Sequence, residues 1–171
     1  MKHYYKQKPI RLKKYSCIFN TYIFLSGIKA CYKYDSRVKK IIDETPQGND
    51  FLIGILEHHH AIVVTKLGEE LHCRMVIDYI PSGECVEIMF KNIASANLVL
   101  ANKISFFQAY TQARFVTKGD NRKAMEFVKM CMIVQSYLAS VRKKGKYLEE
   151  RLPLEVSPSL IRSHVFFRGW L

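Results

Sequence analysis

The stretch KISFFQAYTQARFVTKGDNRKAMEFVKMCMIVQSYLASVRKKG, residues 103–145, predicts a short helix, a strand and a long helix in immediate succession. Ser105 and Gln108 have the spacing of a capping box, in which each side chain bonds the backbone amide of the other residue. A short helix is therefore expected over residues 106–113, with its apolar residues at helical spacing.

A strand and a longer helix are expected to follow. Residues 114–118 combine aromatic and β-branched side chains in a run too short for a helix, which is typical of a strand. Gly119 permits a turn, and Asp120 can accept hydrogen bonds from the first free amides of a helix. Apolar side chains then recur at three- and four-residue steps towards Gly145, which predicts an amphipathic helix with a methionine-rich face.

The residues upstream of this stretch alternate in a way that is typical of strands. We expect strands at 61–65, 71–80, 85–91 and 96–101, and the Pro-Ser-Gly-Glu turn at 81–84 is expected to join two of them as an antiparallel hairpin. Helices are expected at 16–30 and 36–44. The predicted fold is α+β: a mostly antiparallel sheet of four or five strands, covered on one face by helices.

Length and composition indicate one globular domain with extensions. The chain has 171 residues, of which 49% are hydrophobic and 25% charged, and this excludes a disordered or low-complexity class. We expect a basic N-terminal extension with helices over 1–50, the α+β domain over 51–145 and a docking tail over 146–171. The formal net charge of +12 arises mainly in residues 1–40, which carry eleven Lys or Arg and one acid.

Five cysteines without any Cys-x-x-Cys spacing indicate reduced thiols rather than a disulfide framework. We therefore expect a cytoplasmic protein, with peripheral contact to a membrane as an option. The apolar run at 16–30 is interrupted by polar residues and is too short to span a bilayer.

Two segments carry a family resemblance: SANLVLANKISFFQAY at 95–110 and FVTKGDNRKAMEFVKM at 115–130. They resemble the C-terminal half of the sterol carrier protein type two domain, although family members have a longer segment between the short helix and the Lys-Gly-Asp strand. The matching residues are Ala96, Leu98, Leu100, Phe106, Phe107, Val116, Lys118, Gly119, Asp120, Ala124, Met125 and Val128.

The resemblance implies an apolar cavity between the sheet and the helices that holds a lipid, a sterol or a fatty acyl chain. Methionine and phenylalanine suit such a lining because their side chains are large, and methionine is adaptable. A helix face rich in methionine and phenylalanine is also typical of an ordinary packed core. The residues expected to bind the ligand are Met75, Ile77, Ile88, Phe90, Leu98, Phe106, Phe107, Tyr110, Phe127, Met130, Cys131 and Val134.

The basic N-terminal arm is expected to bind an anionic membrane surface, because each Lys or Arg near such a surface contributes about 1 kcal/mol. The cations assigned to this contact are Lys2, Lys6, Lys8, Arg11, Lys13 and Lys14.

Catalytic motifs are absent from the sequence, so a non-enzymatic function without a cofactor is expected. The run of His58, His59 and His60 does not by itself supply the convergent ligands that zinc needs, and no metal is expected. Two alternatives to lipid transfer remain: a nucleic-acid-binding protein that uses the basic aromatic arm, and an accessory subunit that packs on a protein partner.

Overall fold

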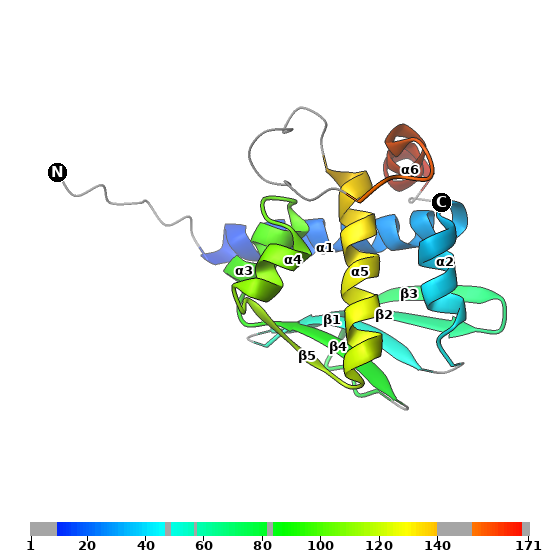
Figure 1. The fold of residues 1–171 in the computed structure, drawn as a ribbon. Coiled ribbons are helices and arrows are strands. Elements are labelled where there is room, and N and C mark those ends of the chain that lie inside the picture. The colour runs from blue at the N-terminus through cyan, green and yellow to red at the C-terminus, as the bar shows by residue number, and fades with distance from the viewer. Residues whose placement is uncertain (1–9, 47–48, 57, 82–83, 140–151, 169–171) are drawn as a thin grey trace.

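The computed structural model describes residues 10–46, 49–56, 58–81, 84–139 and 152–168. These residues form an α+β fold with one five-stranded sheet and six α-helices. The helices lie on one side of the sheet, and α5 crosses in front of α1 (Figure 1).

The sheet is mixed rather than mostly antiparallel as the sequence predicted. Its order is β3-β2-β1-β4-β5, and β1 and β4 run parallel, whereas the other neighbouring pairs run antiparallel. The strands are β1 (Asp50–Ile55), β2 (His58–Leu67), β3 (Glu70–Ile77), β4 (Cys85–Phe90) and β5 (Phe115–Lys118).

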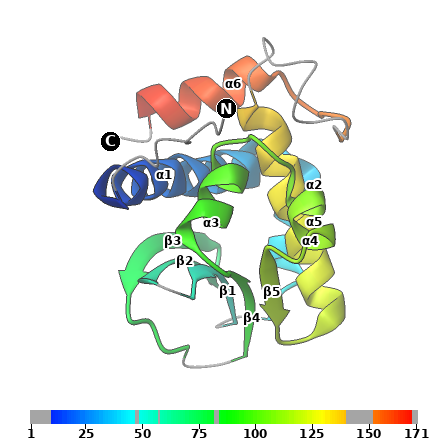
Figure 2. The ribbon, with the colours of Figure 1, turned by 90° about the vertical axis from the view of Figure 1, so that its left-hand side faces the viewer.

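The predicted hairpin between residues 71–80 and 85–91 is wrong. β3 lies at one edge of the sheet and β4 lies beyond β2 and β1, so the chain must cross the sheet between them. Figure 2 shows this connection on the side away from the helices. Tyr79, in the connection, packs with Leu52 and Val63 and donates a hydrogen bond to Asp50. The proline turn therefore belongs to a crossover that covers the second face of the sheet.

β1 is a central strand that the sequence analysis did not predict. All six of its residues are buried, because the helices cover one face and the crossover covers the other. A strand buried on both faces lacks the alternation of apolar and polar residues by which half-buried strands are recognised.

The helices are α1 (Ile10–Tyr34), α2 (Ser36–Asp43), α3 (Ile93–Leu100), α4 (Phe106–Thr111), α5 (Asn121–Leu138) and α6 (Pro158–Ser163), followed by the π-helical turn η2 (His164–Arg168). α3 replaces the strand predicted at 96–101. Asn92 caps it by accepting a hydrogen bond from the backbone amide of Ser95, and Ala96, Val99 and Leu100 are buried. A short apolar run is ambiguous between strand and helix, and here the cap favours the helix.

The opening stretch of the sequence folds largely as predicted. The capping box is present: the backbone amide nitrogen of Gln108 lies 3.0 Å from Ser105 Oγ, and the backbone amide nitrogen of Ser105 lies 3.1 Å from Gln108 Oε1. Gly119 has a φ of 94° at the turn after β5, and Asp120 caps α5. The predicted continuation of this helix beyond 139 lies outside the described residues.

The core lies between the sheet and the helices α1, α3, α4 and α5. Phe127 of α5 stacks on Phe51 of β1 with ring centroids 4.6 Å apart. Gly27 lets α1 approach α5, since a Cβ atom at this glycine would lie 2.9 Å from a methyl carbon of Leu138.

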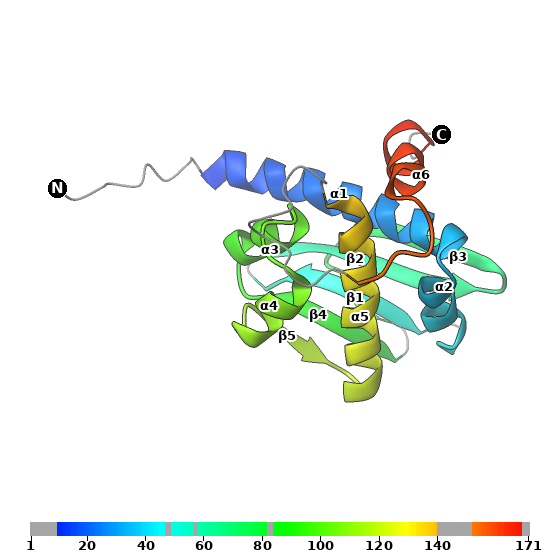
Figure 3. The same ribbon diagram turned by 45° about the horizontal axis from the view of Figure 1, so that its top comes forward.

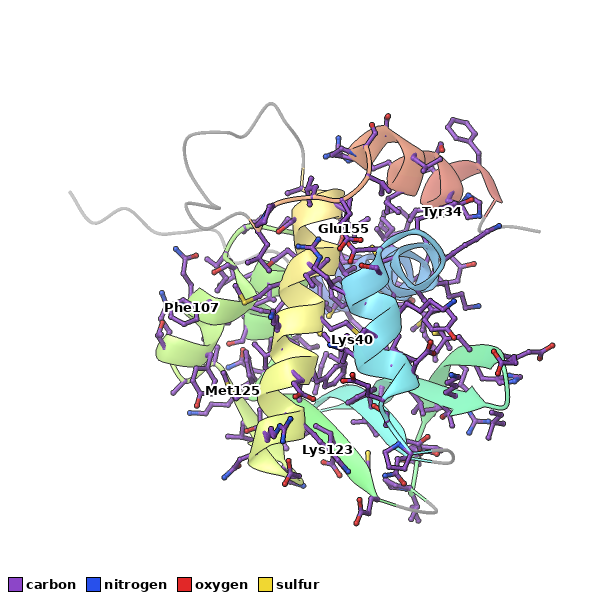
Figure 4. The ribbon with its side chains drawn as sticks, turned by 45° about the vertical axis from the view of Figure 1, so that its right-hand side comes forward. Tyr34, Lys40, Phe107, Lys123, Met125 and Glu155 are labelled. Atoms are coloured by element: carbon purple, nitrogen blue, oxygen red, sulfur yellow. The ribbon has the colours of Figure 1, made fainter. Side chains whose placement is uncertain are left out.

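The C-terminal segment packs against α1 and α5, with Ile161 and Val165 buried. Pro158 begins α6 as its first residue. A proline at the first helical position loses no hydrogen bond, because the amide there has no partner within the helix. In Figure 4, Glu155 lies beside the ends of α1 and α5, where this segment enters.

Candidate ligand-binding site

The predicted ligand-binding residues fall into two groups in the structure. Seven of the twelve form the packed core between the sheet and the helices, and each of these is fully buried: Ile88, Phe90, Phe106, Phe127, Met130, Cys131 and Val134. Phe106 contacts Phe24 of α1 with ring centroids 5.4 Å apart, and Phe127 stacks on Phe51. Side chains thus fill the layer beneath α5, where the sequence analysis expected the cavity.

The other five predicted residues lie at or near the surface. Met75 and Leu98 are half-buried, whereas Ile77, Phe107 and Tyr110 are exposed. Phe107 points away from the body on the outer side of α4 (Figure 4). The structure therefore does not bring the twelve residues together around one space, but Met75 and Phe90 line the clefts described next.

Two clefts lie beneath α1, the first towards β1 and α3 and the second towards β3. Their α1 residues recur at three- and four-residue steps, from Lys14 and Ile18 through Tyr22 to Lys29 and Lys33. α1 lies over the sheet beside the edge strand β3 in Figure 2. A helix above a sheet edge leaves a groove because the sheet does not extend beneath the outer side of the helix.

The first cleft is small and apolar. Its volume is about 30 Å³, which is close to the room that one water molecule occupies. Ile18 of α1, Ile53 of β1 and Phe90 of β4 contribute to its walls, together with Ile93 and Leu100 of α3. Lys14, Cys17 and His60 are the charged or titratable residues in its lining.

The second cleft is larger, with a volume of about 440 Å³. This lies within the range of about 300–1,000 Å³ that is typical of small-molecule sites. Leu25 and Ala30 of α1 are buried at its floor, and Cys73 and Met75 of β3 form the opposite wall. His164 of η2 closes one side.

Met75 lines both clefts and lies between them. Its side chain is unbranched and has three rotatable bonds, so it can change conformation at a lower cost than a branched side chain. We refer to the two clefts together as the groove beneath α1. From Lys14 to Lys29 the helix rises about 22 Å at 1.5 Å per residue, which gives the span of α1 that the two clefts share.

The charged residues that line the larger cleft are all basic. Lys29 and Lys33 lie one turn apart on α1 and are exposed, and Arg74 lies on β3. The Arg74 guanidinium is 5.4 Å from the centre of the Tyr79 ring, and Tyr79 belongs to the crossover on the opposite face of the sheet. The positive charge at the cleft therefore comes mainly from the two lysines.

The thiols at the two clefts are poor nucleophiles. Burial raises the pKa of the Cys73 thiol to about 12, against a smaller opposing effect of Lys29. Burial also raises the pKa of Cys17, which lines the first cleft. Both side chains are therefore protonated near neutral pH and do not present a thiolate.

The cations assigned to membrane binding lie only partly within the described residues. Lys2, Lys6 and Lys8 are outside them. Arg11, Lys13 and Lys14 belong to the first turns of α1, so this part of the predicted arm is helical, and the Lys14 side chain is exposed. The N-terminal end of α1 lies at one side of the molecule, above α3 (Figure 3).

No group of three or more His, Cys, Asp or Glu side chains that could hold a metal ion occurs in the described parts of the chain. Of the histidine run, His60 lines both the first cleft and a cleft on the helix-free face of the sheet. None of the described helices combines the length and the apolar character needed to cross a bilayer.

The groove beneath α1 could not be found from the pattern of α1 alone. Cys17, Ile18, Tyr22 and Leu25 share a periodic apolar stripe, and such a stripe is also typical of a helix packed flat on a core. The informative signal was the placement of Lys29 and Lys33 in register with that stripe.

Comparisons of the chain with protein-family models, with curated proteins and with solved structures gave no match.

Proposed function

We propose that the protein binds a lipid or another apolar small molecule in the groove between α1 and β3, and that it carries this ligand without reacting with it. The observation that carries the proposal is the cleft of about 440 Å³ beneath α1, which meets a second, apolar cleft at Met75. The local sequence resemblance to the sterol carrier protein type two domain supports the same class of ligand.

The chemistry of the lining supports binding rather than catalysis. Leu25, Ala30 and Met75 give the larger cleft an apolar floor and wall. The nearby thiols of Cys73 and Cys17 are held protonated by burial, so they do not supply a nucleophile. A ligand would be held mainly by removal of its apolar surface from water.

Sequestration of this kind can compete with a membrane. Each buried methylene contributes about 0.8 kcal/mol, so a chain of about a dozen methylenes needs a comparably apolar site before it leaves a bilayer. The first cleft is too small for such a chain as it stands, and its volume must increase by movement of Met75 and of the α1 side chains above it. Ligand entry is therefore coupled to a rearrangement along α1.

Replacement of Met75 by tryptophan tests this function, because the larger ring would fill the junction of the two clefts. The full chain and the Met75→Trp variant would be titrated with a fluorescent fatty-acid analogue. We expect the variant to bind at least about tenfold more weakly, since overpacking blocks the path between the clefts. Lipid extraction and mass spectrometry of the purified wild-type chain would identify any ligand that copurifies.

Met125→Trp is the matched control. Met125 lies on the outer side of α5, away from α1 and β3 (Figure 4), and its side chain is 46% exposed. This variant is expected to bind like the wild type. Met75→Ala should bind at least as tightly as the wild type, because it widens the junction. The proposal fails if the wild type binds no lipid or if both tryptophan variants bind equally well.

A further inference from the structure

We infer that the ligand is a single-chain anionic amphiphile, whose carboxylate or phosphate head group is held by Lys29 and Lys33 while its chain lies along α1 towards Met75. The inference rests on the proposed function, and it adds the charge of the head group and the direction of the ligand. It follows from the charges around the larger cleft and from the difference between the two clefts in lining and in volume.

The two lysines provide a positive end to an otherwise apolar groove. Lys29 and Lys33 are four residues apart and therefore project from the same side of α1. Neither has a carboxylate within ion-pair distance among the residues that the structure describes. No acidic residue lines the larger cleft in the described part of the chain. An anion there would gain two cationic partners that no carboxylate occupies, although the Lys33 ammonium also lies 5.3 Å from the centre of the Tyr34 ring.

The position of the lysines also sets the direction of the ligand. Leu25, Ala30 and Met75 lie deeper than the lysines, and beyond Met75 the first cleft is lined mainly by apolar side chains. In the described part of the chain, Lys14 is the only lysine that lines the first cleft, so an anionic group there would have one cationic partner, against two at Lys29 and Lys33. The head group therefore belongs at Lys29 and Lys33, and the chain belongs towards Met75.

The length of the groove suits a chain rather than a bulky ring system. The two clefts follow one helix over about 22 Å, and their volumes are about 440 Å³ and about 30 Å³. A flexible chain can follow such a path when Met75 moves. A rigid polycyclic ligand would need the narrow end to open over a much larger width.

Isothermal titration calorimetry with dodecanoate, dodecanol and inorganic phosphate, each below its aggregation concentration, tests the inference. The wild-type chain would be compared with the double variant Lys29→Glu/Lys33→Glu. We expect the double variant to bind dodecanoate about tenfold more weakly or worse, with dodecanol binding nearly unchanged. Raising the salt concentration should weaken the binding of dodecanoate and have little effect on dodecanol.

Lys103→Glu/Lys129→Glu is the matched control, because it changes the net charge equally at two exposed lysines that line neither cleft. It should leave dodecanoate binding unchanged. The inference is overturned if the two double variants lose dodecanoate binding equally, if dodecanoate and dodecanol binding fall together, or if inorganic phosphate binds as tightly as dodecanoate. If the wild type binds neither dodecanoate nor dodecanol, the proposed function itself fails. Tight dodecanol binding that is insensitive to both variants, without dodecanoate binding, refutes only the anionic head group.

Discussion

Asp35, between α1 and α2, connects three parts of the chain through its buried carboxylate. Arg37 donates to it at 2.6 and 3.1 Å, and the hydroxyl of Tyr137, near the end of α5, donates at 2.7 Å. The same Tyr137 hydroxyl accepts from the backbone amides of Glu155 and Val156. The Asp35 carboxylate therefore contributes, through Tyr137, to holding the C-terminal segment.

The protonation of Asp35 links this connection to pH. Burial raises the pKa of Asp35, but hydrogen bonds from Arg37 and Tyr137 outweigh burial and hold the pKa below its usual value. A carboxyl whose pKa is lower in the folded state stabilises that state fully above its unfolded pKa, which is about 4. That contribution is lost as the pH falls through the lower pKa of the folded state.

We predict that Asp35→Asn lowers the free energy of unfolding by about 3 kcal/mol at pH 7, because it leaves the Arg37 charge without its buried partner. The difference between the variant and the wild type should shrink below pH 4, where protonation removes the same charge from the wild type. Urea unfolding followed by circular dichroism at pH 7 and pH 3 measures both quantities.

Glu126→Gln is a suitable control for the Asp35 experiment, since Glu126 forms a solvent-exposed pair with Arg122 one turn away on α5. Such pairs contribute only about 0.3–0.5 kcal/mol. A loss for Asp35→Asn no larger than that of the control would show that the carboxylate does not hold the segments together.

The elements that were predicted correctly carry their signals within a few residues. α4 has its capping box at Ser105 and Gln108, and α5 begins at Asp120 directly after a glycine with positive φ. These interactions form within one turn of chain, so they do not depend on what packs nearby. α2 was predicted correctly as well, and Asp35 caps it in the same way.

The elements that were missed are determined by distant parts of the chain. β1 is buried on both faces because α5 covers Phe51 and the crossover covers Leu52, and neither neighbour adjoins β1 in sequence. The parallel pairing of β1 with β4 follows from that crossover. A turn signal such as Pro81 indicates that the chain bends, but it does not indicate which strands then become neighbours.

The same limit applies to the candidate site. The Met- and Phe-rich face of α5 has the composition of a cavity lining and also that of a core, and the two cannot be distinguished by periodicity. In the structure, Phe127 and Met130 are fully buried. The groove beneath α1 unites residues of α1 with Cys73 and Met75 of β3, more than forty positions later in the chain. The sequence of either segment alone does not indicate a contact between residues so far apart in the chain.

Gln135 of α5 shows how one buried side chain can fix the arrangement of three helices. Its amide nitrogen donates to the carbonyl oxygens of Val99 and Ile104, and its Oε1 accepts from the amide of Phe106. The end of α3 and the start of α4 are thereby tied to α5. We predict that Gln135→Leu destabilises the fold by about 3 kcal/mol, because it removes the partner of the Phe106 amide and of the Ile104 carbonyl, whereas the Val99 carbonyl still accepts from the Asn102 amide.

Thermal and urea unfolding of Gln135→Leu would be compared with those of Gln112→Leu, a substitution at an exposed position after α4. The exposed variant should change the free energy of unfolding by less than about 0.5 kcal/mol. Equal stability of the two variants would contradict the role assigned to Gln135.

At the scale of the whole molecule, the distribution of charge distinguishes α1 from the rest of the fold. This helix of 25 residues has five cationic side chains and no acidic one, although the chain carries fifteen acids in total. Tyr15 and Phe19, near its N-terminal end, are 68% and 59% exposed. Exposed aromatic rings on a helix that carries cationic and no acidic residues are typical of surfaces that bind the headgroup region of an anionic membrane.

Membrane contact through α1 would place the lipid groove next to the bilayer, because Lys14 borders the apolar cleft and directly precedes Tyr15. We predict that Tyr15→Ser/Phe19→Ser reduces binding to phosphatidylserine-containing vesicles at least about fivefold in sedimentation assays, since each ring loses its buried apolar area at the interface. Wild-type binding should also weaken with added salt, and neutral phosphatidylcholine vesicles should bind poorly.

Phe107→Ser/Tyr110→Ser provides the control for the vesicle experiment, because it removes two other exposed aromatic rings, which are 41% and 44% exposed, from α4 and leaves α1 intact. Its vesicle binding should equal that of the wild type. Vesicle binding that does not distinguish the two double variants would place the membrane contact elsewhere. That result would not contradict ligand binding in the groove, because the calorimetric titrations contain no bilayer. The calorimetric titrations therefore test how the ligand is held, and the vesicle sedimentation assays test where it is exchanged.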